Sequence, residues 1–216
     1  MTWPTSSRSS PSLLLPGSLT AVHPLWLRIS HWLNALAVLV LVTSGWQIYN
    51  ASPLFEGLVF VPWLTLGEDL TAALRWHFAA MWLLAGNGAV YLASNLVGGR
   101  FAARFLPLTA RALMRDVAAA LRGRLGHADV RHYNQVQRLA YLLAMLDTLL
   151  LVLSGLVLWK SVQFPLLREL LGGYEMARRV HFVAMAGLVA FVALHLLMVA
   201  LVPRTLPAML GKGRGA

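Results

Sequence analysis

The sequence contains no cysteine and few charged residues. Without cysteine the chain cannot form disulfides, ligate iron–sulfur clusters through thiolates, or attach a c-type haem through a Cys-x-x-Cys-His motif. Only 12% of its 216 residues are charged, whereas a soluble domain carries about 25%. Hydrophobic residues make up 58% of the chain, and they gather in runs of the length that crosses a bilayer, roughly 20 residues. The composition therefore predicts one integral membrane domain and no separate soluble domain.

Four apolar runs predict the transmembrane helices of an all-α four-helix bundle. Together with their connections they span residues 23–202, and the runs lie at about 27–49, 76–96, 138–159 and 180–202. A fifth segment, at about 107–125, places Arg111, Arg115 and Arg122 on one stripe of a helix. This pattern is typical of an amphipathic helix that lies on the cytoplasmic lipid surface.

The positive charge of the chain, formally +10, is interpreted through membrane topology rather than through nucleic-acid binding. If the N-terminus lies inside, the inner segments (1–30, 98–138 and 203–216) hold 13 Lys and Arg against two acids. The outer segments (50–75 and 160–179) then hold five basic and five acidic residues. The positive-inside rule thus predicts that both termini lie in the cytoplasm.

The two ends of the chain are expected to be tails. Residues 1–22 are rich in Ser and Pro, and their only apolar run, 13–15, is too short for a signal-peptide core of about 7–15 residues. We expect a disordered cytoplasmic tail there, with the first helix acting as an uncleaved insertion signal. Residues 203–216 are expected to form a basic cytoplasmic tail.

The helices also contain a weak internal repeat. The second and the fourth both begin with Arg-x-His-Phe-x-Ala-Met, at 75–81 and 179–185, and the first and the third both end in Ser-Gly, at 44–45 and 154–155. Two related helix pairs that face each other make a natural four-helix bundle.

Four of the seven histidines lie within the predicted membrane helices, where an ionisable residue is costly and suggests function. His31 lies near the inner side, whereas His77 and His181 open their helices at the outer side. His195 follows His181 by 14 residues, about 21 Å deeper in a helix and on nearly the same face. His23, His127 and His132 lie outside the predicted spans and are interpreted as solvated or as facing lipid headgroups.

These depths predict two pairs, His77 with His181 outside and His31 with His195 inside. Neutral imidazole is a strong iron ligand, and bis-histidine iron suits electron transfer because it leaves no open position for a substrate. The pattern therefore favours two non-covalently bound b-type haems over four separate core histidines, each bonded to a backbone carbonyl. The sequence leaves the role of Asp147, in the middle of the third helix, open between proton relay and a bond to a neighbouring Ser or Thr.

Four arginines flank the two predicted haem levels. Each is a candidate partner for a haem propionate, and each equally suits an interfacial position with its charged end in the headgroups. They are Arg28, Arg75, Arg138 and Arg179.

These residues give the chain a resemblance to a known family. Its Arg-x-x-His-Trp at 28–32, its Tyr-Asn-x-x-Gln at 133–137 and its two histidines 14 residues apart resemble the bacterial cytochrome b561 and nickel–iron hydrogenase b-type cytochrome superfamily, which includes formate dehydrogenase gamma subunits. The resemblance covers roughly residues 23–202. It implies the same haem pairing and a quinone beside the inner haem, near Asn134, Gln137 and His195. Asn134 is equally suited to cap a helix.

The resemblance further implies a subunit of the bacterial inner membrane that exchanges electrons between a periplasmic oxidoreductase and the quinone pool. Such a subunit has no catalytic residues of its own and is not a stand-alone enzyme. The apolar outer loop and the arginine-rich inner helix are more similar to cytochromes encoded with periplasmic molybdenum oxidoreductases of the sulfite-oxidase type. The rival hypotheses are a proton or metal-cation transporter, which needs ligands that converge at one depth, and a haem-free membrane anchor.

Overall fold

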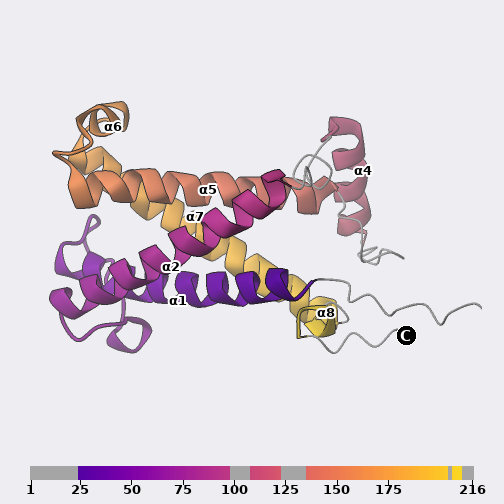
Figure 1. Cartoon of the computed structure of the whole chain (residues 1–216), viewed down its shortest axis with the longest axis horizontal. Helices are drawn as coiled ribbons and strands as arrows, with labels where there is room; N and C mark the ends of the chain where they lie inside the picture. The colour runs from indigo at the N-terminus through magenta and orange to yellow at the C-terminus, as the bar shows by residue number, and fades with distance from the viewer. Residues whose placement is uncertain (1–23, 98–107, 123–134, 204–205, 211–216) are drawn as a thin grey trace, which may run out of the picture.

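The computed structural model describes residues 24–97, 108–122, 135–203 and 206–210. The described part is all-α, as predicted, and four of its helices are long and apolar enough to cross a membrane. These are α1 (Leu25–Ala51), α2 (Leu70–Val97), α5 (Gln135–Lys160) and α7 (Tyr174–Leu201). Shorter elements connect or follow them (Figure 1): η1 (Pro62–Leu64), α4 (Ala110–Leu121), α6 (Pro165–Leu170) and α8 (Leu206–Leu210).

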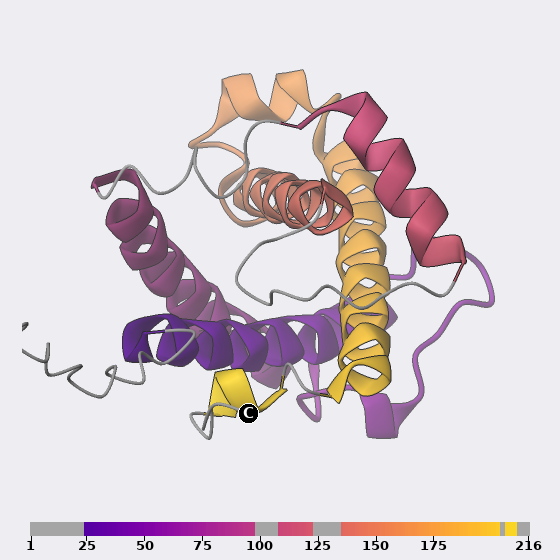
Figure 2. The same ribbon diagram turned by 90° about the vertical axis from the view of Figure 1, so that its right-hand side faces the viewer.

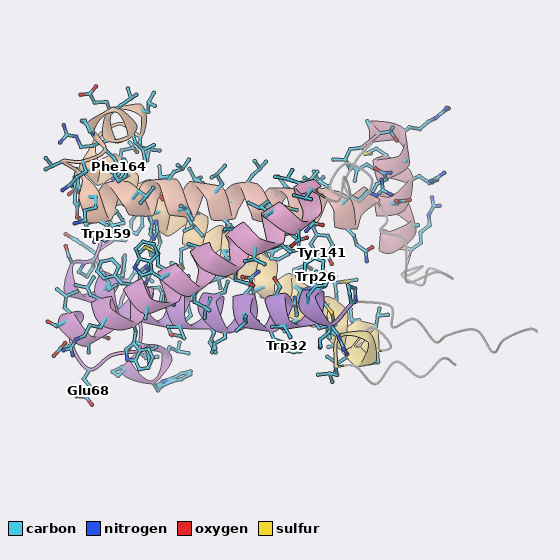
Figure 3. All side chains as sticks on the ribbon, viewed as in Figure 1. Trp26, Trp32, Glu68, Tyr141, Trp159 and Phe164 are labelled. Carbon is cyan, nitrogen blue, oxygen red and sulfur yellow. The ribbon has the colours of Figure 1, made fainter. Side chains whose placement is uncertain are left out.

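The molecule has two ends, which we name after the short helices found there. At the α6 end α1 and α5 finish and α2 and α7 begin, whereas α4 and α8 lie at the other end, the α4 end (Figure 1). Figure 2 looks onto the α4 end. Aromatic side chains mark both ends in Figure 3, with Trp159 and Phe164 at the α6 end and Trp26, Trp32 and Tyr141 at the α4 end. Such rings suit the two interfaces of a bilayer.

Each long helix begins before the apolar run that predicted it. α2 begins at Leu70 rather than near residue 76, because the backbone N–H of Ala72 donates to Asp69 Oδ1 at 2.7 Å and so caps the helix start. α7 begins at Tyr174, directly after Gly172 and Gly173, whose φ values of 79° and 94° favour glycine. The length of the apolar run reflects the thickness of the bilayer, whereas the capping residues decide where the helix begins.

The long helices pack mainly as two hairpins, α1 with α2 and α5 with α7. Small side chains are buried inside each hairpin. They recur at equivalent positions around the histidine on the second helix of the hairpin, which is His77 on α2 and His181 on α7. Ala73 and Ala80 flank His77 by four and three residues, and Ala177 and Ala184 flank His181 in the same way. Small residues let membrane helices approach closely. The sequence repeat is therefore also a repeat of packing.

A cationic side chain links the two hairpins at the α6 end. Arg178 on α7 donates from Nη2 to the backbone oxygen of Ser52 at 2.7 Å and from Nη1 to Glu175 at 3.1 Å. Ser52 directly follows α1, so the guanidinium lies at the negative end of that helix, where a cation is stabilising.

The apolar loop 52–69 folds back onto the α6 end and contains no long helix. Asn50 bonds to both the backbone N–H and the backbone oxygen of Phe60, at 2.9 and 2.8 Å, and the Phe60 ring stacks on Trp46 with centroids 4.7 Å apart.

At the α4 end, the carboxylate of Asp116 on α4 accepts a hydrogen bond from the backbone N–H of Gln135, the first residue of α5, at 2.9 Å. The amphipathic helix is thereby attached to the start of a membrane helix.

The tails expected from the sequence lie largely outside the described residues. Residues 1–22 and Asn134 are not among the residues that the structure describes, nor are His23, His127 and His132. Within the segment 203–216 the structure describes α8, and Trp32 on α1 donates from Nε1 to the backbone oxygen of Met209 at 3.4 Å.

Candidate haem-binding sites

Helix α7 carries one histidine toward each end of the molecule. His181 lies in its second turn and His195 in its last third, and α7 runs without interruption between them. Fourteen residues at 1.5 Å each separate the two positions by about 21 Å along the helix. Each lies at the level of a histidine from the other hairpin, which gives an α6-end pair (His77 and His181) and an α4-end pair (His31 and His195).

The rings of the α4-end pair meet edge to face, and each comes from a different hairpin. Their centroids are 6.1 Å apart, and the ring planes are inclined by 62°. A metal ion bonded to both imidazoles at about 2 Å per bond separates the ring centroids by about 6 Å, so the observed spacing fits a bis-histidine iron. Two further rings lie beside the pair, Trp32 at 5.4 Å from His31 and Phe191 stacked at 6.2 Å from His195.

The α6-end pair is held by serines from the neighbouring helix. Ser44 Oγ lies 3.1 Å from His77 Nδ1, and Ser154 Oγ lies 3.0 Å from His181 Nδ1. Both serines are fully buried. The two imidazoles are close enough to interact electrostatically. Because each Nδ1 faces a serine, each ring keeps Nε2 for a metal, and the residues present fit a second bis-histidine iron.

The glycine after each serine leaves room for the histidine ring. A Cβ at Gly45 would lie 3.5 Å from His77 Cε1, and a Cβ at Gly155 would lie 3.3 Å from His181 Cε1. The Ser-Gly repeat noted in the sequence thus has one role in both hairpins. Serine bonds the ring, and glycine makes space for it. The sequence contained this signal, but only the packing of the hairpins reveals its partner.

The four candidate propionate partners differ in their surroundings. Arg28 lies one turn before His31, and its Nε is buried with no hydrogen-bond partner, which fits a carboxylate ligand at this level. Arg75 and Arg179 are exposed at the α6 end, each two residues before its histidine, and Arg75 lines a cavity of about 380 Å³. Arg138 lies in the first turn of α5, at the α4 end.

The predicted quinone residues lie where α5 begins. Gln137 is in the first turn of α5, at the same end of the molecule as the α4-end pair, while Asn134 falls outside the described residues. The neighbouring Gln135 has a buried Oε1 without a hydrogen-bond partner. Nothing in the sequence pattern had singled out Gln135.

Asparagines near the α4-end pair form a second set that sequence reasoning missed. Asn87 on α2 donates from Nδ2 to the backbone oxygen of Ser30 at 2.8 Å and to Oδ1 of Asn34 at 2.7 Å. Asn34 lies one turn beyond His31 on α1. These bonds fix α2 against the part of α1 that presents His31.

Asp147 lies in the middle of α5 and faces α7. Its Oδ1 would be 3.4 Å from a Cβ at Gly187, and its Oδ2 is buried with no hydrogen-bond partner. The adjacent Thr148 instead donates to the backbone oxygen of Ala144 at 2.8 Å. Of the two roles left open, the bond to this neighbouring threonine is not formed.

Across the described ranges, no group of three or more His, Asp and Glu side chains converges to hold a metal ion. A metal-cation transporter would need such a group of ligands, whereas bis-histidine haem ligation requires only pairs, because the porphyrin supplies the other four iron ligands.

A known protein family and a known protein are similar to this chain. The family described as prokaryotic cytochrome b561 matches residues 22–212. A curated relative from Azospira oryzae, named as a putative protein-methionine-sulfoxide reductase subunit YedZ1, is 61% identical over 191 residues, which cover 88% of this chain and 96% of that protein. The chain therefore belongs to the prokaryotic cytochrome b561 family and is a multi-pass membrane cytochrome that binds haem b and transfers electrons.

Proposed function

We propose that the chain is a di-haem cytochrome b that carries electrons across the bacterial inner membrane, between the quinone pool and a periplasmic oxidoreductase. The observation that carries this proposal is the arrangement of four imidazoles as two pairs, at levels about 21 Å apart along α7. One haem at each level forms a path across most of the bilayer, whose hydrocarbon core is about 30 Å thick.

The α6 end faces the periplasm in this proposal, and both termini lie in the cytoplasm. The distribution of Lys and Arg supports this orientation, because the connections at the α4 end and the two tails hold most of them. The domain boundaries follow: tails at residues 1–22 and 203–216, and the four-helix haem domain between them.

The residues of the chain hold and orient the cofactors. His77 and His181 would hold the iron of the periplasmic haem, and His31 and His195 would hold that of the cytoplasmic haem. Each haem, when bound, supplies a one-electron couple at its iron. The buried Nε of Arg28 supports propionate binding by this residue, and Arg75, Arg138 and Arg179 are the other candidates.

The quinone binds at the α4 end, beside the cytoplasmic haem. Gln137 lies at this end and Asn134 precedes α5 directly in the sequence, which supports the assignment made from the family resemblance. Amide groups at this position donate hydrogen bonds to a quinone carbonyl oxygen. Protons for quinone chemistry then exchange with the cytoplasm.

The partner is a periplasmic reductase that acts on methionine sulfoxide in proteins. The name of the relative at 61% identity supports this partner. Reducing a sulfoxide to a thioether consumes two electrons and two protons, so electrons flow from quinol through the two haems to the partner. The sequence resemblance to cytochromes of molybdenum oxidoreductases suggests that the partner holds molybdenum.

A haem count tests the proposal. The purified chain should show a b-type spectrum in a dithionite-reduced minus oxidised difference, with about two haems per chain. His181→Ala should remove the α6-end haem and retain the other, and His31→Ala should do the reverse. A wild-type preparation that binds one haem, or none, would overturn the di-haem path, and a haem-free protein that moves protons or cations would support the transporter instead.

Electron flow is tested in membranes. Quinol should reduce both haems of the wild type, and Gln137→Leu should slow this reduction without loss of haem. Co-purification with the periplasmic reductase, and oxidation of the reduced haems when its sulfoxide substrate is added, would support the partner. Reduced haems that stay reduced under these conditions would exclude it.

A further inference from the structure

We propose that Ser44 and Ser154 are positioning residues that hold the α6-end histidines in the tautomer with a protonated Nδ1, so that Nε2 is presented to the iron. This inference rests on the proposed haem ligation and adds to it the device by which the protein selects the ligand nitrogen.

The direction of each hydrogen bond follows from the number of hydrogens available. A serine hydroxyl has one hydrogen, and a carbonyl oxygen only accepts. Ser44 Oγ lies 2.6 Å from the backbone oxygen of Val40, its shorter contact, so it donates its hydrogen there. Toward His77 Nδ1, at 3.1 Å, Ser44 Oγ can therefore only accept a hydrogen bond. Nδ1 must therefore carry the hydrogen.

The second hairpin repeats this arrangement. Ser154 Oγ lies 2.6 Å from the backbone oxygen of Leu150 and 3.0 Å from His181 Nδ1. The same proton argument gives His181 a protonated Nδ1. Two independent hairpins thus reach the same tautomer through the same chain of bonds, from histidine to serine to the carbonyl four residues earlier.

Backbone carbonyls support this assignment. The backbone of Leu41 is a hydrogen-bond partner of the His77 ring, and the backbone of Leu151 is one of the His181 ring. Each is three residues before its serine, and a carbonyl also requires the ring to be the donor. Serine and carbonyl both act as acceptors toward the ring, which agrees with a protonated Nδ1.

The arrangement has a consequence for the haem. A ligating histidine that donates its other N–H to an acceptor is oriented by it and becomes a more basic ligand. A more basic ligand favours ferric over ferrous iron and lowers the midpoint potential. The serines thus hold the α6-end haem at a lower potential than its two histidines alone would set.

The ordinary structural alternative is that these serines only bond their own helix, as serine and threonine commonly do in membrane helices. Thr43 offers a matched control, because its Oγ1 donates to the backbone oxygen of Leu39 at 2.8 Å and it is adjacent to Ser44. It makes the same helix bond without contacting a histidine.

The test compares Ser44→Ala, Ser154→Ala, the double variant, Ser44→Thr and Thr43→Ala in the full-length protein. Haem per chain and an optical redox titration are measured for each, with the electron paramagnetic resonance of the ferric haems. We expect each alanine variant to raise the midpoint of the α6-end haem and to weaken its retention about tenfold. The α4-end haem serves as an internal reference and should not change. Ser44→Thr, which restores a hydroxyl, should return toward wild type, and Thr43→Ala should have no effect.

An unchanged or lowered α6-end midpoint in the double variant would overturn the inference, as would an equal shift in Thr43→Ala. Loss of the α6-end haem from an alanine variant supports it if threonine restores binding, and contradicts it if threonine does not. A wild-type protein without haem at the α6 end would instead refute the proposed function, so the two failures are distinguishable.

Discussion

The space beside the α6-end histidine differs between the two hairpins, so the same glycine-to-alanine substitution should have a different effect in each. Alanine at Gly155 would place its Cβ 3.3 Å from His181 Cε1, closer than about nine in ten real Cβ contacts, so the ring must shift by a few tenths of an ångström. Alanine at Gly45 would lie 3.5 Å from His77 Cε1, an ordinary van der Waals contact. At Gly86 nothing lies within 4 Å.

Two opposing contributions decide the outcome. Replacing a helical glycine by alanine stabilises the helix by up to about 1 kcal/mol, whereas overpacking a filled position costs about 1–3 kcal/mol. Gly86→Ala should therefore be stabilising, and Gly45→Ala should be stabilising or neutral. Gly155→Ala should lose about 1–2 kcal/mol of binding at the α6-end haem relative to Gly86→Ala, a factor of roughly 5–30.

The assay is the rate at which apomyoglobin removes haem from the purified variants, with the two haems resolved by their spectra. Thermal unfolding in the same detergent reports the stability of the helices separately. Valine at either Gly45 or Gly155 adds an isopropyl group and should abolish the α6-end haem in both variants. If Gly155→Ala retained its haem as well as Gly86→Ala, the proposed close approach of ring and helix would be wrong.

Three further predictions concern polar side chains on the long helices. Asn87→Leu removes both bonds to α1 and should lower the free energy of unfolding by about 1–3 kcal/mol, with faster loss of the α4-end haem than of the other; equal loss of both would contradict this. Arg178→Ala removes the bonds to Ser52 and should cost about 1 kcal/mol in thermal unfolding, whereas Glu175→Ala, which removes only an exposed ion pair, should cost less than about 0.5 kcal/mol. Asp147→Leu removes a buried oxygen without a partner and should raise thermal stability by about 1 kcal/mol with both haems retained; slower quinol oxidation in this variant would instead support a proton relay.

The architecture could be predicted from the sequence because two lengths are known in advance for membrane helices: the thickness of the bilayer and the rise per residue. The thickness of the bilayer sets the apolar run, and the rise of 1.5 Å per residue converts the spacing of His181 and His195 into depth. The proximity of the His31 and His195 rings follows from the same geometry, while their ligation of iron stays a prediction. Helix starts were less predictable, because capping by Asp69 and the turn at Gly172 act outside the apolar run.

The bonds that orient side chains could not be predicted in the same way. Ser44 and Ser154 were visible as a repeat, but a serine in a membrane helix usually bonds only its own backbone, so the sequence alone cannot show that it also meets a histidine. The bonds of Asn87 depend on how α2 rotates against α1, which no periodicity specifies when most residues of both helices are apolar. The sequence therefore predicted the depth of a residue along its helix well, and the rotation of one helix against another poorly.

The internal repeat holds at the α6 end and breaks at the α4 end, and this difference has a physical consequence. With Ser44 matched to Ser154 and His77 to His181, the same offsets match His31 to Tyr141 and His195 to Tyr91. The α6-end site thus takes equivalent residues from both hairpins. The α4-end site takes non-equivalent residues, because one histidine lies on the first helix of its hairpin and the other lies on the second helix of the other hairpin. Two bis-histidine sites built from one repeat therefore have unequal surroundings. Unequal surroundings would give the two proposed haems different midpoint potentials, because hydrogen bonding and burial around a haem tune its potential.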